Sequence, residues 1–207
     1  MSDDDLNARL LAAAEAMEGK RTPPSKYGTE CFALVDGLLR KLGAKTAADG
    51  DVRVTGTADY DWGDEFASLE DLKPGDILQF TNHVVDTAIW RYANNQWHEA
   101  EGIPHTRPHH TAIVREVRAD GSVEVIETNV QPHPTLVVRN VILRLEAGEE
   151  TRNVSNVERI KVRVTGSVRA YHPAPKPPQG AFILPPGGSR TRASVPSRLS
   201  PNQFSAR

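Results

Sequence analysis

Disulfide bonds, membrane spans and a secretion signal are all missing from this sequence. It contains a single cysteine, Cys31, so no intramolecular disulfide can form and nothing indicates folding in an oxidising compartment. No stretch approaches the roughly 18 apolar residues of a membrane span, and the N-terminus, MSDDDLNARL, is acidic where a signal peptide would be basic. We therefore expect a protein that is made in the cytoplasm and whose one thiol is available for chemistry.

An excess of either charge is also lacking. The 25 Lys and Arg residues nearly balance the 27 Asp and Glu residues, which leaves a formal net charge of -2. Such a balance creates no global field for a polyanion, so a general nucleic-acid binder is excluded.

Metal-binding motifs are absent from the sequence as well. There is no HExxH motif and no pair of cysteines. Pro108 separates His105 from His109, which argues against a helix that presents both imidazoles on one face to a metal ion. We expect neither a metal nor a cofactor.

Two helices are predicted in the first quarter of the chain. Apolar residues at helical spacing predict a helix over residues 5–18 that ends at Gly19. After the loop KRTPPSKYGTE, the run FALVDGLLRKL predicts a second helix over residues 32–42, closed by Gly43. Cys31 stands at the start of this second helix.

Strand patterns dominate from about residue 71 onward. The run LKPGDILQF places a Pro-Gly turn before a short strand, and residues 111–117 and 123–129 flank turn residues as a hairpin. Residues 136–145 predict one or two further strands, and residues 160–164 alternate as in a half-buried strand. The order predicts an α+β protein with helices first and an antiparallel sheet after them.

We expect three segments in the chain: an N-terminal helix (1–20), a folded domain (21–172) and a tail (173–207). The tail is rich in Pro, Ser and Gly, with five basic residues and no acidic one. We predict that it is disordered.

The placement of Cys31 suits a nucleophile. The unpaired amides at a helix start favour a thiolate, and a histidine held by a polar group normally completes the activation. With a two-residue turn at Asp120-Gly121, Val114 would pair with Glu127, so that His110 shares a face with both Glu127 and Asn129. His109 would point to the other face. Either polar residue could orient the imidazole of His110.

These motifs together resemble the CHAP amidase and peptidase family, which is related to NlpC/P60 enzymes within the papain-like fold. The resemblance is carried by the helix-leading cysteine, LKPGDILQF, HHTAIV and a strand that ends in ETN. It implies N-terminal helices packed on an antiparallel sheet or partial barrel, with Cys31 as nucleophile, His110 as base and Glu127 or Asn129 as orienting group. It also implies hydrolysis of amide bonds in the peptide part of bacterial peptidoglycan. A protein with that substrate would leave the cytoplasm by a route other than Sec, through a phage holin or contact-dependent secretion.

Further candidate residues surround this proposed centre. The backbone amide of Cys31 is the expected oxyanion donor, and the side chain of Tyr27 is one of several candidates for a second donor. Residues 82–109 are longer than the connection needs and predict a hairpin that shapes the cleft. The candidate cleft residues are Trp62, Trp90, Trp97 and His109.

Two other readings of the sequence stay open. In the first, Cys31 is a buried packing residue, and the protein is a non-catalytic binding module whose tail recruits a protein partner. In the second, the site acts on a cytoplasmic amide or isopeptide bond. Digestion of a defined substrate separates the readings.

Overall fold

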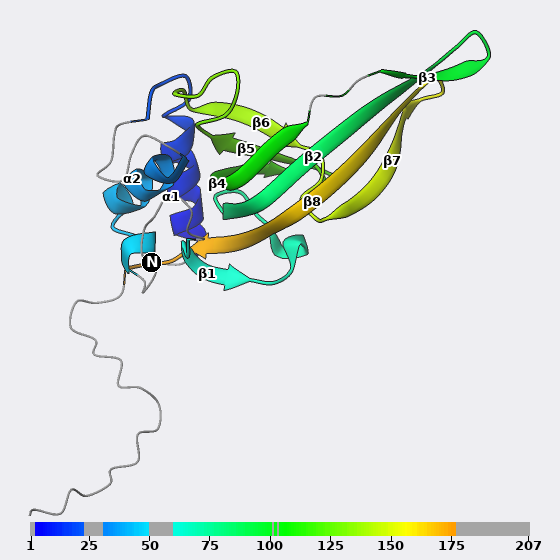
Figure 1. The fold of residues 1–207 in the computed structure, drawn as a ribbon. Coiled ribbons are helices and arrows are strands. Elements are labelled where there is room, and N and C mark those ends of the chain that lie inside the picture. The colour runs from blue at the N-terminus through cyan, green and yellow to red at the C-terminus, as the bar shows by residue number, and fades with distance from the viewer. Residues whose placement is uncertain (1–2, 23–30, 50–59, 101, 103, 177–207) are drawn as a thin grey trace, which may run out of the picture. The chain divides into compact units, whose positions relative to one another are not determined.

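The computed structural model describes residues 3–22, 31–49, 60–100, 102 and 104–176 (Figure 1). The chain divides into two compact units, Met1–Pro177 and Pro178–Arg207. All described residues belong to the first unit, and the predicted disordered tail lies outside them except for residues 173–176.

Two α-helices precede the sheet, as the sequence predicts. Helix α1 spans Asp3–Glu15 and helix α2 spans Cys31–Leu42, with short 3-10 helices at Ala47–Asp49 and Leu69–Asp71. In α2, Leu34, Val35 and Leu38 are buried at helical spacing, and Gly43 ends the helix with a positive φ of 69°. Cys31 is therefore the first residue of α2.

The described strands form one antiparallel sheet. They are β1 (Gly63–Phe66), β2 (Ile77–Ala93), β3 (Gln96–Ala100), β4 (His105–Val117), β5 (Val123–Glu127), β6 (Val138–Ile142), β7 (Gly148–Ser155) and β8 (Glu158–Pro173). The order across the sheet is β1-β8-β2-β4-β5-β6, with β3 added to β2 and β7 added to β8. The long strands β2 and β8 pair along most of their length and form its spine.

The prediction of a papain-like α+β fold is wrong. Strands account for 52% of the structure and helices for 19%, so the protein is sheet-rich. The reason lies in pairing between distant segments. Residues 82–109, which we expected to add a hairpin beside the cleft, instead complete β2, form β3 and begin β4. The whole of β7, which the sequence pattern did not predict, pairs with β8.

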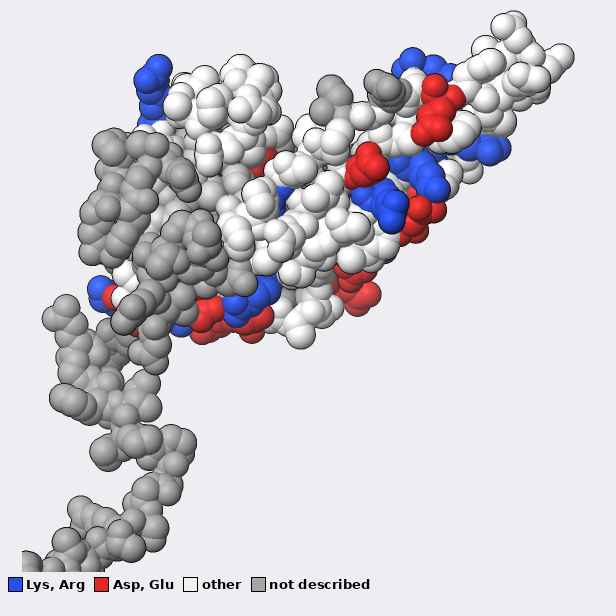
Figure 2. Space-filling view, viewed as in Figure 1, with Lys and Arg blue, Asp and Glu red and all other residues white. Residues whose placement is uncertain are grey.

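The outer halves of β2 and β8, together with β3 and β7, form an extension that we call the arm (Figure 1). Asn94 and Asn95 both have positive φ and make the tight turn between β2 and β3. Charges of both signs alternate along the arm (Figure 2), including the ion pair between Arg91 and Glu158 at 3.0 Å.

Two hydrophobic cores lie on opposite faces of the sheet. The first packs α1 and α2 against residues such as Ile77 and Ile113, and the second contains Leu78 and Phe80. Because neighbouring residues of β2 and β4 alternate between the two cores, both faces of these strands are buried. Helix α1 belongs to the first core rather than to a separate N-terminal segment.

The predicted Gly75-Asp76 turn anchors the first core. The buried carboxylate of Asp76 accepts hydrogen bonds from the Asn7 side chain at 2.6 Å, His172 Nδ1 at 2.7 Å and the Lys73 amide at 2.8 Å. A Cβ atom on Gly75, which has a φ of 88°, would lie 2.2 Å from the carbonyl oxygen of Asn7. Only glycine allows this close approach of α1 to the start of β2.

The folded unit continues beyond the predicted boundary at residue 172. The Lys45 amide donates to the carbonyl of Ala174 at 2.8 Å, and Lys176 pairs with Asp49 at 2.8 Å. In the described ranges, no helix has both the length and the apolar character needed to cross a membrane.

Candidate active site

Cys31 is buried where α2 meets β4. The residue is only 5% exposed, and its Sγ lies 3.9 Å from the carbonyl oxygen of His109. Cys31 is also near enough to the imidazole of His110 to raise its pKa. The sole cysteine thus lies close to the predicted histidine, although the two residues are 79 positions apart in the sequence.

His110 is held on its other side by Glu127. Its Nε2 lies 2.8 Å from Glu127 Oε2, and both side chains are buried. Because the carboxylate is an acceptor, Nε2 carries the proton of this hydrogen bond and Nδ1 is left for Cys31. The three side chains therefore form a line from thiol to imidazole to carboxylate.

The predicted face of His110 is correct although the predicted register is wrong. The turn closes with the Arg118 amide donating to the Ser122 carbonyl, and an irregularity follows between Val114 and Glu116. Val114 consequently pairs with Val125 instead of Glu127. A shift of two residues keeps side chains on the same face, whereas a shift of one would have reversed them.

Glu127 is the centre of a larger buried cluster. Arg107 binds its carboxylate through two hydrogen bonds, from Nε at 3.0 Å and from Nη2 at 2.7 Å. The Asn140 side chain donates a further bond at 2.8 Å. Including the bond from His110, the carboxylate accepts four hydrogen bonds, which compensate for its removal from water.

Sequence reasoning missed Arg107 and Asn140. Arg107 stands three positions before His110, and on a regular strand residues three apart point to opposite faces. Both side chains nonetheless reach Glu127, and the adjacent strand β2 is irregular here, with Asn82 at a positive φ of 49° and a shift in its pairing with β8 between Thr81 and Val84. Nothing in the sequence RPHH signals that Arg107 and His110 bind the same carboxylate.

Electrostatics favour the charged forms of His110 and Glu127. Burial opposes protonation of His110, but hydrogen bonds and charge attraction from Cys31 and Glu127 outweigh it and raise its pKa to about 9. Burial likewise opposes ionisation of Glu127, and the bonds from His110 and Arg107 overcome this and hold its pKa far below the usual range. The site therefore contains an imidazolium beside the thiol.

Other sequence-predicted site residues lie elsewhere. Asn129 is exposed and its φ is 64°; the carboxylate of Glu127, not Asn129, receives the hydrogen bond from His110. Trp62 is fully buried in the first core beside the rings of Phe32 and Tyr60. A side chain without exposed surface cannot contact a substrate in this conformation. Tyr27 lies outside the described residues.

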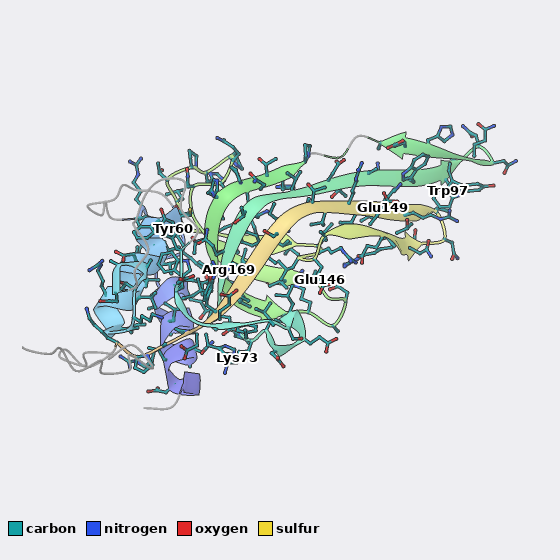
Figure 3. The ribbon with its side chains drawn as sticks, turned by 60° about the horizontal axis from the view of Figure 1, so that its bottom comes forward. Tyr60, Lys73, Trp97, Glu146, Glu149 and Arg169 are labelled. Carbon is teal, nitrogen blue, oxygen red and sulfur yellow. The ribbon has the colours of Figure 1, made fainter. Side chains whose placement is uncertain are left out.

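The remaining tryptophans belong to the arm. Trp90 on β2 pairs with Glu99 on β3, the strand that also holds Trp97. Figure 3 shows Trp97 near the outer end of the arm, whereas Tyr60 lies beside the helices. Neither arm tryptophan therefore shapes a cleft at the start of α2. His109 does border the site, through its carbonyl oxygen.

A hollow of about 430 Å³ adjoins the cluster around Glu127. Both Arg107 and Asn140 contribute to its wall, and most of its other lining residues come from the two chain segments that flank them. These residues are Pro104, His105, Thr106, Asn129, Val130, Gln131 and Pro132. Two side chains of its wall, Arg107 and Asn140, therefore bind the Glu127 carboxylate directly.

The pH dependence of stability should identify His110. Its folded pKa of about 9 lies above the ordinary value of 6.5, so the stabilisation from its protonated form is complete below that ordinary value and is lost as the pH rises through 9. We expect the wild type to lose roughly 3 kcal/mol more than His110→Gln across this window. Urea unfolding at a series of pH values measures the difference. Parallel curves for the two proteins would contradict the assignment.

Glu127 has the opposite dependence. Because its folded pKa is depressed, its contribution is present above the ordinary pKa of 4.5 and disappears only as the pH falls well below that value. The two groups together therefore predict maximal stability from this cluster between the ordinary pKa values of Glu127 and His110.

Within the described ranges, no three His, Cys, Asp or Glu side chains are grouped so that they could hold a metal ion. No family model, curated protein or solved structure matches this chain. The geometry of the site is consequently the basis for assigning a function.

Proposed function

We propose that this protein is a cysteine-dependent amidase or peptidase with Cys31 as nucleophile, His110 as acid and base, and Glu127 as the group that orients His110. The observation that carries the proposal is the buried pair of His110 and Glu127, joined at 2.8 Å, with Cys31 near enough to His110 to raise the pKa of its imidazole. A nucleophile, a base and an orienting carboxylate in hydrogen-bond contact are the parts that covalent acyl transfer requires.

In the proposed reaction, His110 holds the proton that Cys31 gives up, and the thiolate attacks the carbonyl carbon of an amide. The backbone amide of Cys31 is placed to donate to the oxyanion, since the first amides of a helix have no partner within it. As the C–N bond breaks, His110 gives its proton to the leaving amine. His110 then removes a proton from water, which attacks the thioester, releases the carboxylic acid and restores Cys31. No cofactor takes part.

We propose the peptide part of bacterial peptidoglycan as the substrate. This choice is supported by the order of the four motifs that resemble CHAP enzymes, and not by their papain-like fold. The hollow beside Glu127 offers amide side chains such as Gln131 and Asn140, which can bind the backbone of a peptide.

Digestion of purified peptidoglycan sacculi tests the proposal. Wild type and Cys31→Ala are compared, and released fragments are identified by mass spectrometry. We expect fragments with new amine and carboxyl termini from the wild type and at least about a thousandfold less from Cys31→Ala, because the alanine variant has no nucleophile.

The negative outcomes of the digestion are also informative. Equal release by both proteins would refute the role of Cys31. If the folded wild type released nothing, peptidoglycan would be excluded, and a cytoplasmic amide substrate or a binding module would take its place. A fluorogenic peptide-amide library then distinguishes these last two.

A further inference from the structure

The described cluster around Glu127 contains more charge than a catalytic triad needs. Arg107 is 4% exposed and Glu127 has no exposed surface, and they are joined by two hydrogen bonds of 3.0 and 2.7 Å. An exposed ion pair contributes little to stability, and a buried pair can be replaced by apolar side chains without loss. A buried arginine at this position therefore calls for a reason other than stability.

Charge balance supplies that reason. In the reactive form of the site, Cys31 and Glu127 are anions while His110 and Arg107 are cations, so the buried charges sum to zero. His83 is the other buried imidazole near Arg107. Burial and the charge of Arg107 both lower its pKa, although a bond to the Leu145 carbonyl opposes them. It is therefore neutral and adds nothing to the balance.

Without Arg107, two anions would face one cation in a buried site. Burial of an unbalanced charge is costly, so one anion would take up a proton. The thiol is the weaker acid, with an ordinary pKa of about 8.5 against about 4.3 for a glutamic acid. Cys31 rather than Glu127 would therefore be protonated, and the nucleophile would be lost.

We propose that Arg107 is a positioning residue that supplies the second positive charge of the site, which lets Cys31 exist as a thiolate while Glu127 stays ionised and oriented toward His110. Its guanidinium is suited to this role because its planar fork matches the carboxylate and because it stays charged when buried. The inference rests on the proposed role of Cys31 as nucleophile, and it adds a residue that acts only through Glu127.

The reactivity of the thiol tests this role without any substrate. Cys31 is the sole cysteine, so iodoacetamide labels one site, and the labelling rate at about pH 7 follows the thiolate fraction. We expect Arg107→Met to slow labelling at least about tenfold relative to the wild type, whereas Arg107→Lys, which keeps the charge, stays within about threefold. Folding of each variant is verified by circular dichroism before labelling.

A matched control comes from the same two strands. Arg115 on β4 pairs with Glu124 on β5 at 3.4 Å, but its side chain is 27% exposed and it does not contact Glu127 in the described structure. Arg115→Met should label like the wild type. Equal labelling of folded Arg107→Met and wild type would overturn the proposal, as would an equal loss in Arg115→Met, which would point to general damage.

A second variant keeps the test decisive if Arg107→Met does not fold. Arg107→Gln keeps hydrogen-bond donors for the Glu127 carboxylate but removes the positive charge. We expect it to fold and to label at least about tenfold more slowly than the wild type. Labelling of folded Arg107→Gln within about threefold of the wild type would refute charge balance. Because labelling needs no substrate, failure of sacculus digestion and failure of this inference are separate results.

Discussion

Replacing His110 with alanine will reduce hydrolysis by about a thousandfold or more. In the proposed mechanism, the side chain holds the proton taken from Cys31 and returns it to the leaving amine, and general acid-base catalysis by one residue is worth about 10² to 10⁴ in rate. The imidazole of His110 is also bound to Glu127 at 2.8 Å, and Cys31 is among the groups that raise its pKa. Turnover of a soluble peptide amide, followed by chromatography of the products, gives the rate of each variant.

His109 provides a matched control for this substitution. It is adjacent in the chain and borders Cys31 through its backbone carbonyl, which alanine retains. We expect His109→Ala to lose less than about tenfold in kcat, because no proton transfer passes through its side chain. If His109→Ala were the more damaged variant, the assignment of His110 as the base would be wrong.

Replacing Glu127 with glutamine will have the largest effect on stability. The variant keeps the shape of the side chain but removes the negative charge, so that the buried guanidinium of Arg107 loses its counter-ion. Breaking a buried pair from one side costs about 3 to 5 kcal/mol. Glutamine also presents an amide group that can donate toward His110, so we expect kcat to fall by about 10² to 10⁴ in the protein that remains folded.

Glu124→Gln on the same strand is the control for Glu127→Gln. Glu124 is itself buried, but its partners Arg115 and Arg118 are 27% and 39% exposed, so water reaches them when the carboxylate charge is lost. Its substitution should cost less than about 1 kcal/mol and leave kcat unchanged. Urea unfolding curves measure both free energies. A loss for Glu127→Gln no larger than that for Glu124→Gln would contradict the buried charge cluster.

The local elements were predictable because their signals lie within a few neighbouring residues. Apolar spacing and Gly43 define α2, and Cys31 at its start follows from them. The alternation of β4 and β5 placed His110 and Glu127 on one face, and this survived an error in register because the error was two residues. Residue types and short-range periodicity therefore brought together the three central candidates, Cys31, His110 and Glu127.

Only the tertiary structure decided the fold class and the rest of the site. The sheet-rich architecture depends on β7 and the outer halves of β2 and β8, whose pairing joins segments far apart in the sequence and leaves no local pattern. Arg107 joins the cluster where the adjacent strand β2 is irregular, and Asn140 because β6 pairs with β5. The sequence by itself determined which residues are candidates for the proposed chemistry. Pairing between strands that are distant in the sequence decided which charged and polar side chains lie beside the buried Glu127 carboxylate, because hydrogen bonds depend on distance in space and not on separation along the chain.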